Sequence, residues 1–375
     1  MRWVWAVALI LLVGCEQSGD VSECPDGDCG DDDSQTQYRA RGVGIDQVSI
    51  YQSVKVPVVE DGVAASTDVP VVADKEALMR VFLKRVSGFD SREITGRLTV
   101  ESGSGDPSVY ETTLMVDSGW SESNLNSTIN FAISAEDMTP SAEFSIELLE
   151  SELGYKGDEE EQNALYPDEG MASMKAHDMG GPLKIYMLPI RYNADGSGRV
   201  PDLDEPRVGK FESEMAAVYP ASTVDIIVLE PMNWSKPVEA YGNGWGELLQ
   251  EMYYERSRQS IPWDSYLYGI FKPDSSINDY CRQGCVLGLS TLAQSPNDSW
   301  ARVSIGLGFS GDSAWQTFIH ELGHAHGRSH APCQTRDYDY SYPYSGGMIG
   351  SWGYDADSGK MMNPDSYADF MGYCD

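Results

Sequence analysis

Apolar and polar residues alternate with a period of two along the first part of the chain. Val48, Ile50, Val54 and Val56 are predicted to share one face. Further strand-like runs cover residues 78–86, 94–100, 110–116, 129–133 and 144–148. Short strands with frequent turns and almost no helical periodicity are typical of an antiparallel β-sandwich. The pattern predicts an all-β module over residues 41–152, in which no catalytic residue types cluster.

The rhythm changes after an acidic, glycine-containing segment, residues 153–182, which is predicted to be a linker. Apolar residues then recur twice at helical spacing, from Val208 to Tyr219 and from Trp245 to Tyr253. Strand-like runs cover residues 183–192, 224–229, 266–271, 286–292 and 303–309, and the second of these is expected to be buried. Alternating strands and helices indicate an α/β (or α+β) domain over residues 183–375, with a mixed, mostly parallel sheet.

The amino terminus has the features of an export signal. Arg2 supplies a positive charge, and the ten apolar residues 4–13 are too few to span a bilayer. They end in Leu-Val-Gly-Cys15, which resembles the lipobox of bacterial lipoproteins, although an ordinary secretory signal with a chance cysteine remains the alternative. The resemblance implies a signal in residues 1–15 and a lipid on Cys15. It also implies a place in the bacterial cell envelope, with Glu16 favouring the outer membrane of a Gram-negative cell.

Residues 16–40 are rich in Asp, Gly and Ser and cannot bury a core, so a flexible acidic tether is expected. Without Cys15, six of the seven cysteines remain: Cys24, Cys29, Cys281, Cys285, Cys333 and Cys374. An even number in an exported protein favours disulfides. Two pairs are close in sequence, which leaves Cys333 with Cys374. Zinc binding by these thiols is the alternative, but their spacing lacks the second half of a structural zinc site.

The net charge of −33 makes nucleic acid an improbable partner, because the surface repels polyanions. One interpretation of the acidic charge is that it favours solubility. A more specific one is bound calcium, for which Asp355, Asp357 and Gly359 are the best candidate site, although they complete no known calcium loop.

The candidate chemistry lies in residues 320–330. A capping-box pattern at Ser313–Gln316 predicts the start of a helix, on which His320 and His324 share a face. Both imidazoles can reach one Zn²⁺, and Glu321 can contact a water there without ligating the metal. Gly327 allows the chain to leave the helix and to bring in His330 as third ligand. Three ligands and an open position are typical of catalytic zinc.

The segment matches H-E-x-x-H-x-x-G-x-x-H and so resembles the zinc signature of the metzincin peptidases. The resemblance implies one catalytic Zn²⁺, Glu321 as general base, and a Met-turn, for which Met371 is the better candidate than Met361 or Met362. Tyr373 is similar to the metzincin tyrosine that approaches the metal and helps to hold the oxyanion. Residues 330–333, 342–347 and 352–355 look like the StcE-type branch, which cleaves mucins or glycoproteins.

The resemblance covers roughly residues 183–375 and leaves the sandwich outside it. Metzincins usually continue into a C-terminal helix, whereas two residues follow Tyr373 here, so a minimal subdomain or a truncated sequence is expected. The resulting hypothesis is a monomeric, lipid-anchored zinc endopeptidase for extracellular proteins or glycoproteins, without a zymogen thiol. The alternative is a surface-anchored binding protein with a degenerate metzincin domain.

Overall fold

The computed structural model describes residues 37–67, 69–103, 105–151 and 163–374. The predicted signal and lipidation site at Cys15 lie outside these residues, as do Cys24 and Cys29 and most of the predicted tether. Within the described residues, no helix is both long and apolar enough to cross a membrane.

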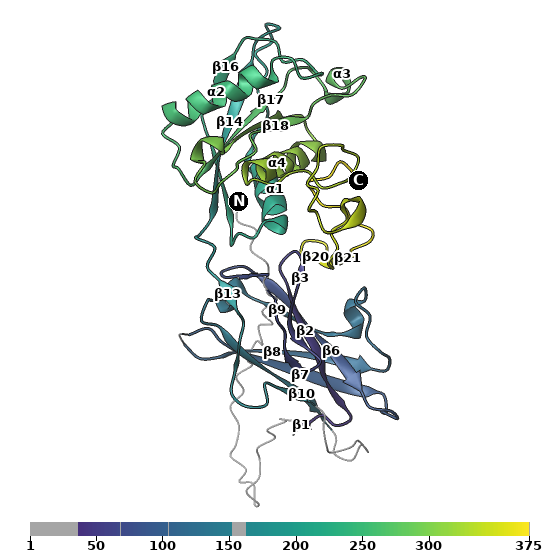
Figure 1. The fold of residues 1–375 in the computed structure, drawn as a ribbon. Coiled ribbons are helices and arrows are strands. Elements are labelled where there is room, and N and C mark those ends of the chain that lie inside the picture. The colour runs from purple at the N-terminus through teal and green to yellow at the C-terminus, as the bar shows by residue number, and fades with distance from the viewer. Residues whose placement is uncertain (1–36, 68, 104, 152–162, 375) are drawn as a thin grey trace, which may run out of the picture. The chain divides into compact units, whose positions relative to one another are not determined.

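Two antiparallel sheets form the first module (Figure 1). One has the order β1-β10-β7-β8 and the other β4-β3-β2-β6-β9. Their strands are β1 (Tyr38–Arg39), β2 (Val43–Tyr51), β3 (Lys55–Glu60), β4 (Val63–Ala64), β6 (Ala77–Arg85), β7 (Arg92–Glu101), β8 (Ser108–Val116), β9 (Ile129–Ile133) and β10 (Glu143–Glu150). The alternating pattern of β7 buries every second residue, as a strand with one core face requires. Buried residues of both sheets, such as Ile50, Leu98 and Phe144, belong to one hydrophobic core.

The module differs from the sequence-based prediction at three places. Val54 is 41 % exposed and does not share the buried face of Val48, because the chain reverses at Ser53 between β2 and β3. The end of the predicted tether forms β1, which pairs with β10. The second half of the predicted linker forms β11 (Leu165–Tyr166), β12 (Ala172–Ser173) and β13 (Ala176–His177), which pair with β10 or with β5 (Val71–Val72). These short edge strands carry too few residues to show a period-two pattern.

A second sheet system follows, with the order β15-β14-β17-β19-β18 and with β16 beside β14. Its strands are β14 (Leu183–Tyr192), β15 (Val224–Val228), β16 (Met232–Trp234), β17 (Tyr266–Phe271), β18 (Gly288–Ser290) and β19 (Val303–Leu307). All neighbours are parallel except β18, which runs antiparallel to β19 at the edge. The helices are α1 (Glu205–Val218), α2 (Trp245–Arg258), α3 (Ile277–Tyr280) and α4 (Asp312–Ala325). A hairpin of β20 (Gly353–Asp355) and β21 (Lys360–Met362) comes after them.

Helices cover both faces of this sheet. Along β17, Tyr268 and Ile270 pack with residues of α1 and α4, whereas Leu267 and Phe271 pack with residues of α2. Successive strand residues point to opposite faces, so α1 and α4 share one face and α2 lies on the other. The helix α4 packs against β19 and β18 (Figure 1). It therefore lies at the edge of the sheet that β18 forms.

The prediction of a fully buried strand at residues 224–229 is wrong. The strand β15 forms the edge of the sheet and pairs only with β14 among the described strands, so Ile227 and Val228 are 40 % and 42 % exposed. An apolar run by itself does not distinguish a central strand from an edge strand.

The described residues from Gln37 onward form one compact unit. The sandwich contacts the second module through backbone hydrogen bonds, from Lys55 N to Trp352 O at 2.8 Å and from Tyr354 N to Ser53 O at 2.8 Å.

We predict that Phe318→Ala lowers the free energy of unfolding by about 3–5 kcal/mol. Phe318 is fully buried on α4, with its ring centroid 5.1 Å from that of Phe211 and 4.9 Å from that of Tyr268. Urea unfolding followed by fluorescence measures the change. Val109→Ala, at a position that is 57 % exposed, is the control and should change it by less than about 0.5 kcal/mol. Equal effects of the two substitutions would contradict the assignment of α4 to the core.

Candidate functional site

The helix α4 carries the first half of the histidine motif. Its existence agrees with the prediction, but its start does not, because Gly311 is the N-cap and no side chain caps the helix. Phe318 and Leu322 face the sheet and are fully buried, so His320 and His324 are turned toward the other side of the helix. The apolar side of α4 therefore fixes the direction of the two imidazoles.

The chain leaves α4 as the sequence predicts. Gly327 has φ 85°, a left-handed conformation, and its N–H donates to His324 O at 2.8 Å. Arg328 N donates back to Gly323 O at 2.9 Å, which completes the helix end. The chain then reverses and places His330 beside the two helical histidines.

The structure brings His320, His324 and His330 together, with ligand atoms that all lie within 4.8 Å of one another. Nε2 of His324 lies 3.1 Å from Nε2 of His330. Each Nδ1 lies within hydrogen-bond distance of a backbone carbonyl: Phe370 O at 2.8 Å for His320, Arg328 O at 2.7 Å for His324 and Asp337 O at 2.9 Å for His330. Carbonyls accept only, so each Nδ1 is the donor of its hydrogen bond, and in a neutral ring Nε2 then carries the lone pair that can bind a metal.

Burial keeps the first two imidazoles neutral. It lowers the pKa of His324 to about 4 and also lowers the pKa of His320. Neutral imidazole is the metal-binding form. Three imidazole nitrogens at one point fit Zn²⁺, whose catalytic sites have three protein ligands.

Glu321 lies on the side of α4 that faces β18 and is 6 % exposed. Burial alone raises the pKa of Glu321 to about 8. A divalent cation at the three imidazoles would act in the opposite direction and favour the carboxylate. Glu321 is not among the side chains of the metal cluster, which leaves its carboxyl available for proton transfer.

Met371 packs against Gly323 of α4 and is 2 % exposed. A Cβ on Gly323 would overlap the Met371 sulfur, so the helix glycine makes room for the methionine. Met371 O accepts from Ala331 N at 3.0 Å, which ties this turn to the residue that follows His330. Met371 therefore packs against α4 and is not among the side chains of the histidine cluster; the Met-turn role remains a prediction.

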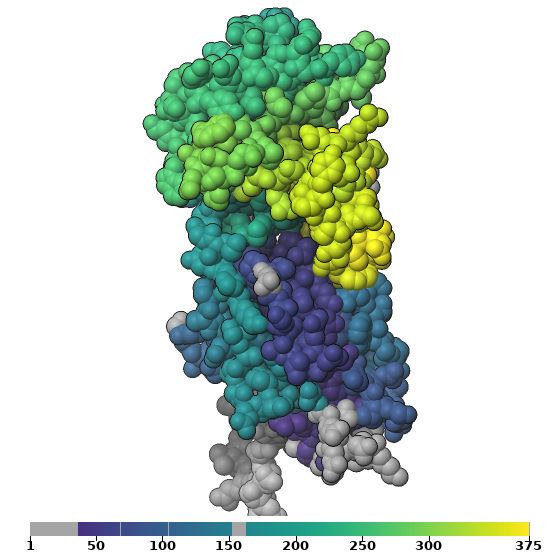
Figure 2. Space-filling model, viewed as in Figure 1, coloured from purple at the N-terminus to yellow at the C-terminus, as the bar shows by residue number. Residues whose placement is uncertain are grey.

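Tyr373 reaches the histidine cluster. Its hydroxyl lies 2.9 Å from His330 Nε2, and its ring centroid lies 5.5 Å from that of His320. Tyr373 is 53 % exposed, so this part of the cluster lies at the surface of the protein. A disulfide between Cys333 and Cys374 joins the segment after His330 to the residue after Tyr373. In the face shown in Figure 2, the residues after α4 (yellow) form a continuous part of the surface.

The edge strand β18 borders the site. Leu307 N donates to Leu287 O and Thr291 N donates to Val303 O, so the ladder to β19 uses the residues at odd positions. In an antiparallel ladder the N–H and C=O groups of Gly288 and Ser290 therefore point away from β19, toward the free edge. The site has a row of main-chain donors and acceptors beside Glu321.

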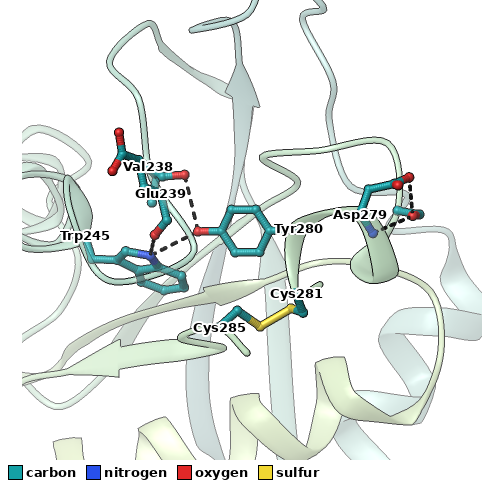
Figure 3. The surroundings of a disulfide bond; sticks show 8 residues. Val238, Glu239, Trp245, Asp279, Tyr280, Cys281 and Cys285 are labelled. Atoms are coloured by element: carbon teal, nitrogen blue, oxygen red, sulfur yellow. Dashed lines mark hydrogen bonds between the residues drawn. A yellow bond between two sulfur atoms is a disulfide. The ribbon is translucent and has the colours of Figure 1, made fainter. Parts of the chain in front are cut away.

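A small disulfide loop precedes this strand (Figure 3). Cys281 and Cys285 are bridged, and Tyr280 OH, which accepts from Trp245 Nε1 at 3.2 Å, donates to Val238 O at 3.3 Å. Val286 N donates to Ala240 O at 2.8 Å. These contacts attach the start of the edge strand to α2 and to the loop before it. Both disulfides that lie in described residues match the predicted pairings; the pairing of Cys24 with Cys29 falls outside them.

His326, the one histidine of residues 320–330 outside the cluster, has a structural role. Its ring stacks on Tyr266 with centroids 4.3 Å apart, and its Nδ1 lies 2.7 Å from Leu322 O. The sequence did not reveal the residues on the sheet that surround Glu321, among them Gly288 and Tyr268. No local motif marks them, because they come from separate strands.

Comparison with protein families agrees with this site. Residues 292–369 match the model of Peptidase M66, a family of zinc metallopeptidases. Comparison with curated proteins gives no match. The matched region contains the three histidines and Glu321, and together with their geometry it supports a peptidase that uses zinc.

We predict that His330→Ala reduces bound zinc from about one ion per chain to a small fraction, because two imidazoles hold zinc far less tightly than three. Metal content after dialysis, measured by mass spectrometry, gives the result. His177→Ala changes an exposed histidine outside the cluster and should keep the zinc. Full zinc content in His330→Ala would exclude His330 as a ligand.

We also predict that replacing Cys333 and Cys374 together by serine lowers the free energy of unfolding by about 2–4 kcal/mol. That bridge spans 41 residues, whereas the Cys281–Cys285 bridge spans 4 and should contribute less through loop closure. Urea unfolding of both double variants compares them. A larger loss for the Cys281–Cys285 variant would contradict this view of the two bridges.

Proposed function

We propose that the chain is a zinc-dependent endopeptidase of metzincin type. The observation that carries this proposal is the meeting of three imidazoles beside a buried glutamate that lies outside the histidine cluster. A zinc site with only a structural role needs four protein ligands and no base. Here three histidines would hold the ion, and the Tyr373 hydroxyl lies beside them, 2.9 Å from His330 Nε2.

The donor set fits zinc. His320, His324 and His330 would hold the ion through their Nε2 atoms, and the backbone carbonyls at their Nδ1 atoms orient the rings. A zinc ion held there supplies Lewis acidity, which polarises a carbonyl and makes water a stronger acid.

Glu321 and Tyr373 perform the remaining steps. The Glu321 carboxylate accepts a proton from the attacking water and delivers it to the leaving amide nitrogen. The Tyr373 hydroxyl lies beside His330 Nε2 and can donate to the oxygen that becomes negative in the tetrahedral state.

The substrate binds as an extended strand along β18. The outward N–H and C=O groups of Gly288 and Ser290 pair with its backbone. This binding is independent of side-chain sequence, so selectivity arises from the loops around the site. Extracellular proteins or glycoproteins are the proposed substrates, in line with the export signal and the disulfides. The proposed location is the bacterial cell envelope, with the lipid on Cys15.

The second candidate is a surface-anchored binding protein whose peptidase domain is inactive. The size of the sandwich, which has a core of its own, favours it. Retention of Glu321 next to the complete histidine set favours the enzyme.

We predict that Glu321→Ala lowers cleavage of a protein panel, which includes casein and a mucin, by at least about 10³-fold. Zinc content should stay near one ion per chain, because Glu321 is not a ligand. The assay uses the chain without residues 1–15, with and without a chelator, and follows products by gel and mass spectrometry. Chelator-sensitive cleavage that disappears in Glu321→Ala supports the enzyme. A zinc-loaded parent that cleaves nothing favours the binding protein.

A further inference from the structure

Two glycines lie directly opposite each other on β18 and β19. Gly288 pairs with Gly306, and the hydrogen bond from Leu307 N to Leu287 O flanks this pair. The pair is therefore of the non-hydrogen-bonded kind, in which the Cα atoms are roughly 4.5 Å apart. Side chains at such positions would point to the same face and touch each other.

Functional groups from other elements reach into the space that these absent side chains leave. A Cβ on Gly288 would lie 2.5 Å from Oε1 of Glu321, and a Cβ on Gly306 would overlap the hydroxyl of Tyr268. Because the two glycines are cross-strand neighbours, the Glu321 carboxylate and the Tyr268 hydroxyl lie close together. Thr317, one turn before Glu321 on α4, borders the same space, 3.2 Å from a Cβ on Gly306.

Tyr268 brings its hydroxyl to this place from the middle of the sheet. Its side chain is fully buried, and its oxygen has no hydrogen-bond partner among the described residues. A buried hydroxyl without a partner is costly, so it marks a place where a polar contact is to be expected. Burial, and after it the charge of Glu321, raises the pKa of Tyr268, so the group remains a donor.

We propose that Tyr268 is a positioning residue for the general base: its hydroxyl donates through a bridging water to the Glu321 carboxylate, in the space opened by Gly288 and Gly306. This inference rests on the proposed function. The hydroxyl fixes the orientation of the carboxylate below the edge strand. The same strand offers the outward N–H and C=O of Gly288 to the substrate, so substrate and base are aligned by one backbone segment.

The first test is kinetic. Tyr268→Phe removes only the hydroxyl, and kcat should fall about tenfold or more, with KM within about twofold and the zinc content unchanged. Tyr266→Phe is the matched control, because it lies on the same strand and face but stacks on His326, away from Glu321. An unchanged kcat in Tyr268→Phe overturns the proposal.

The second test uses the glycine. Gly288→Ala should displace the carboxylate and lower kcat, and in the Glu321→Ala background it should not lower the residual rate further. Gly246→Ala, on α2 with open space around it, is the control for the glycine substitution and should keep full activity. A Gly288→Ala variant with the parent's kcat overturns the proposed space-filling arrangement.

The third test does not need activity. In a double-mutant cycle on the zinc-loaded protein, Tyr268→Phe should lower Tm in the parent and leave it equal or higher in Glu321→Ala. Additive Tm shifts overturn the contact, because a hydroxyl without a partner would behave alike in both backgrounds. If the parent cleaves nothing, the proposed function fails, and the cycle still decides whether Tyr268 and Glu321 interact.

Discussion

Three imidazole nitrogens must lie within reach of one metal ion, and contacts from much of the second module, residues 183–374, hold them there. Each ring is held by a backbone carbonyl at Nδ1, and these carbonyls belong to Phe370, Arg328 and Asp337. They come from three separate turns of the chain. The position of the metal site therefore depends on the folding of the whole C-terminal segment and not on α4 alone.

The segment after α4 is held by few regular hydrogen bonds, so specific contacts replace secondary structure. The left-handed Gly327 starts the reversal, Met371 packs against Gly323, and the Cys333–Cys374 bridge closes the loop. The last two of these contacts join residues near the histidine ligands to Met371 and Cys374. Tyr373 owes its place beside His330 to the same contacts.

The position of Glu321, the proposed base, depends on the sheet. Glu321 is directed by its helix toward the sheet, and it fits there because the facing position on β18 is Gly288; the glycine opposite it, Gly306 on β19, makes room for the Tyr268 hydroxyl. A substituted residue at Gly288 would compete with the carboxylate for the same space. The edge strand thus limits where the base can stand, while its outer side remains available for an extended peptide.

The sequence alone determined the features that depend on local spacing. Residues four apart on a helix share a face, so the pairing of His320 with His324 was predictable. Gly327 likewise predicted that the chain reverses toward His330. Period-two alternation located the sandwich strands for the same reason. Only the tertiary structure decided which strands lie at an edge, as β15 and β18 do, and which residues surround Glu321. Tyr268, Gly288 and Gly306 come from three strands, and their proximity follows from strand order and register, which no local pattern encodes.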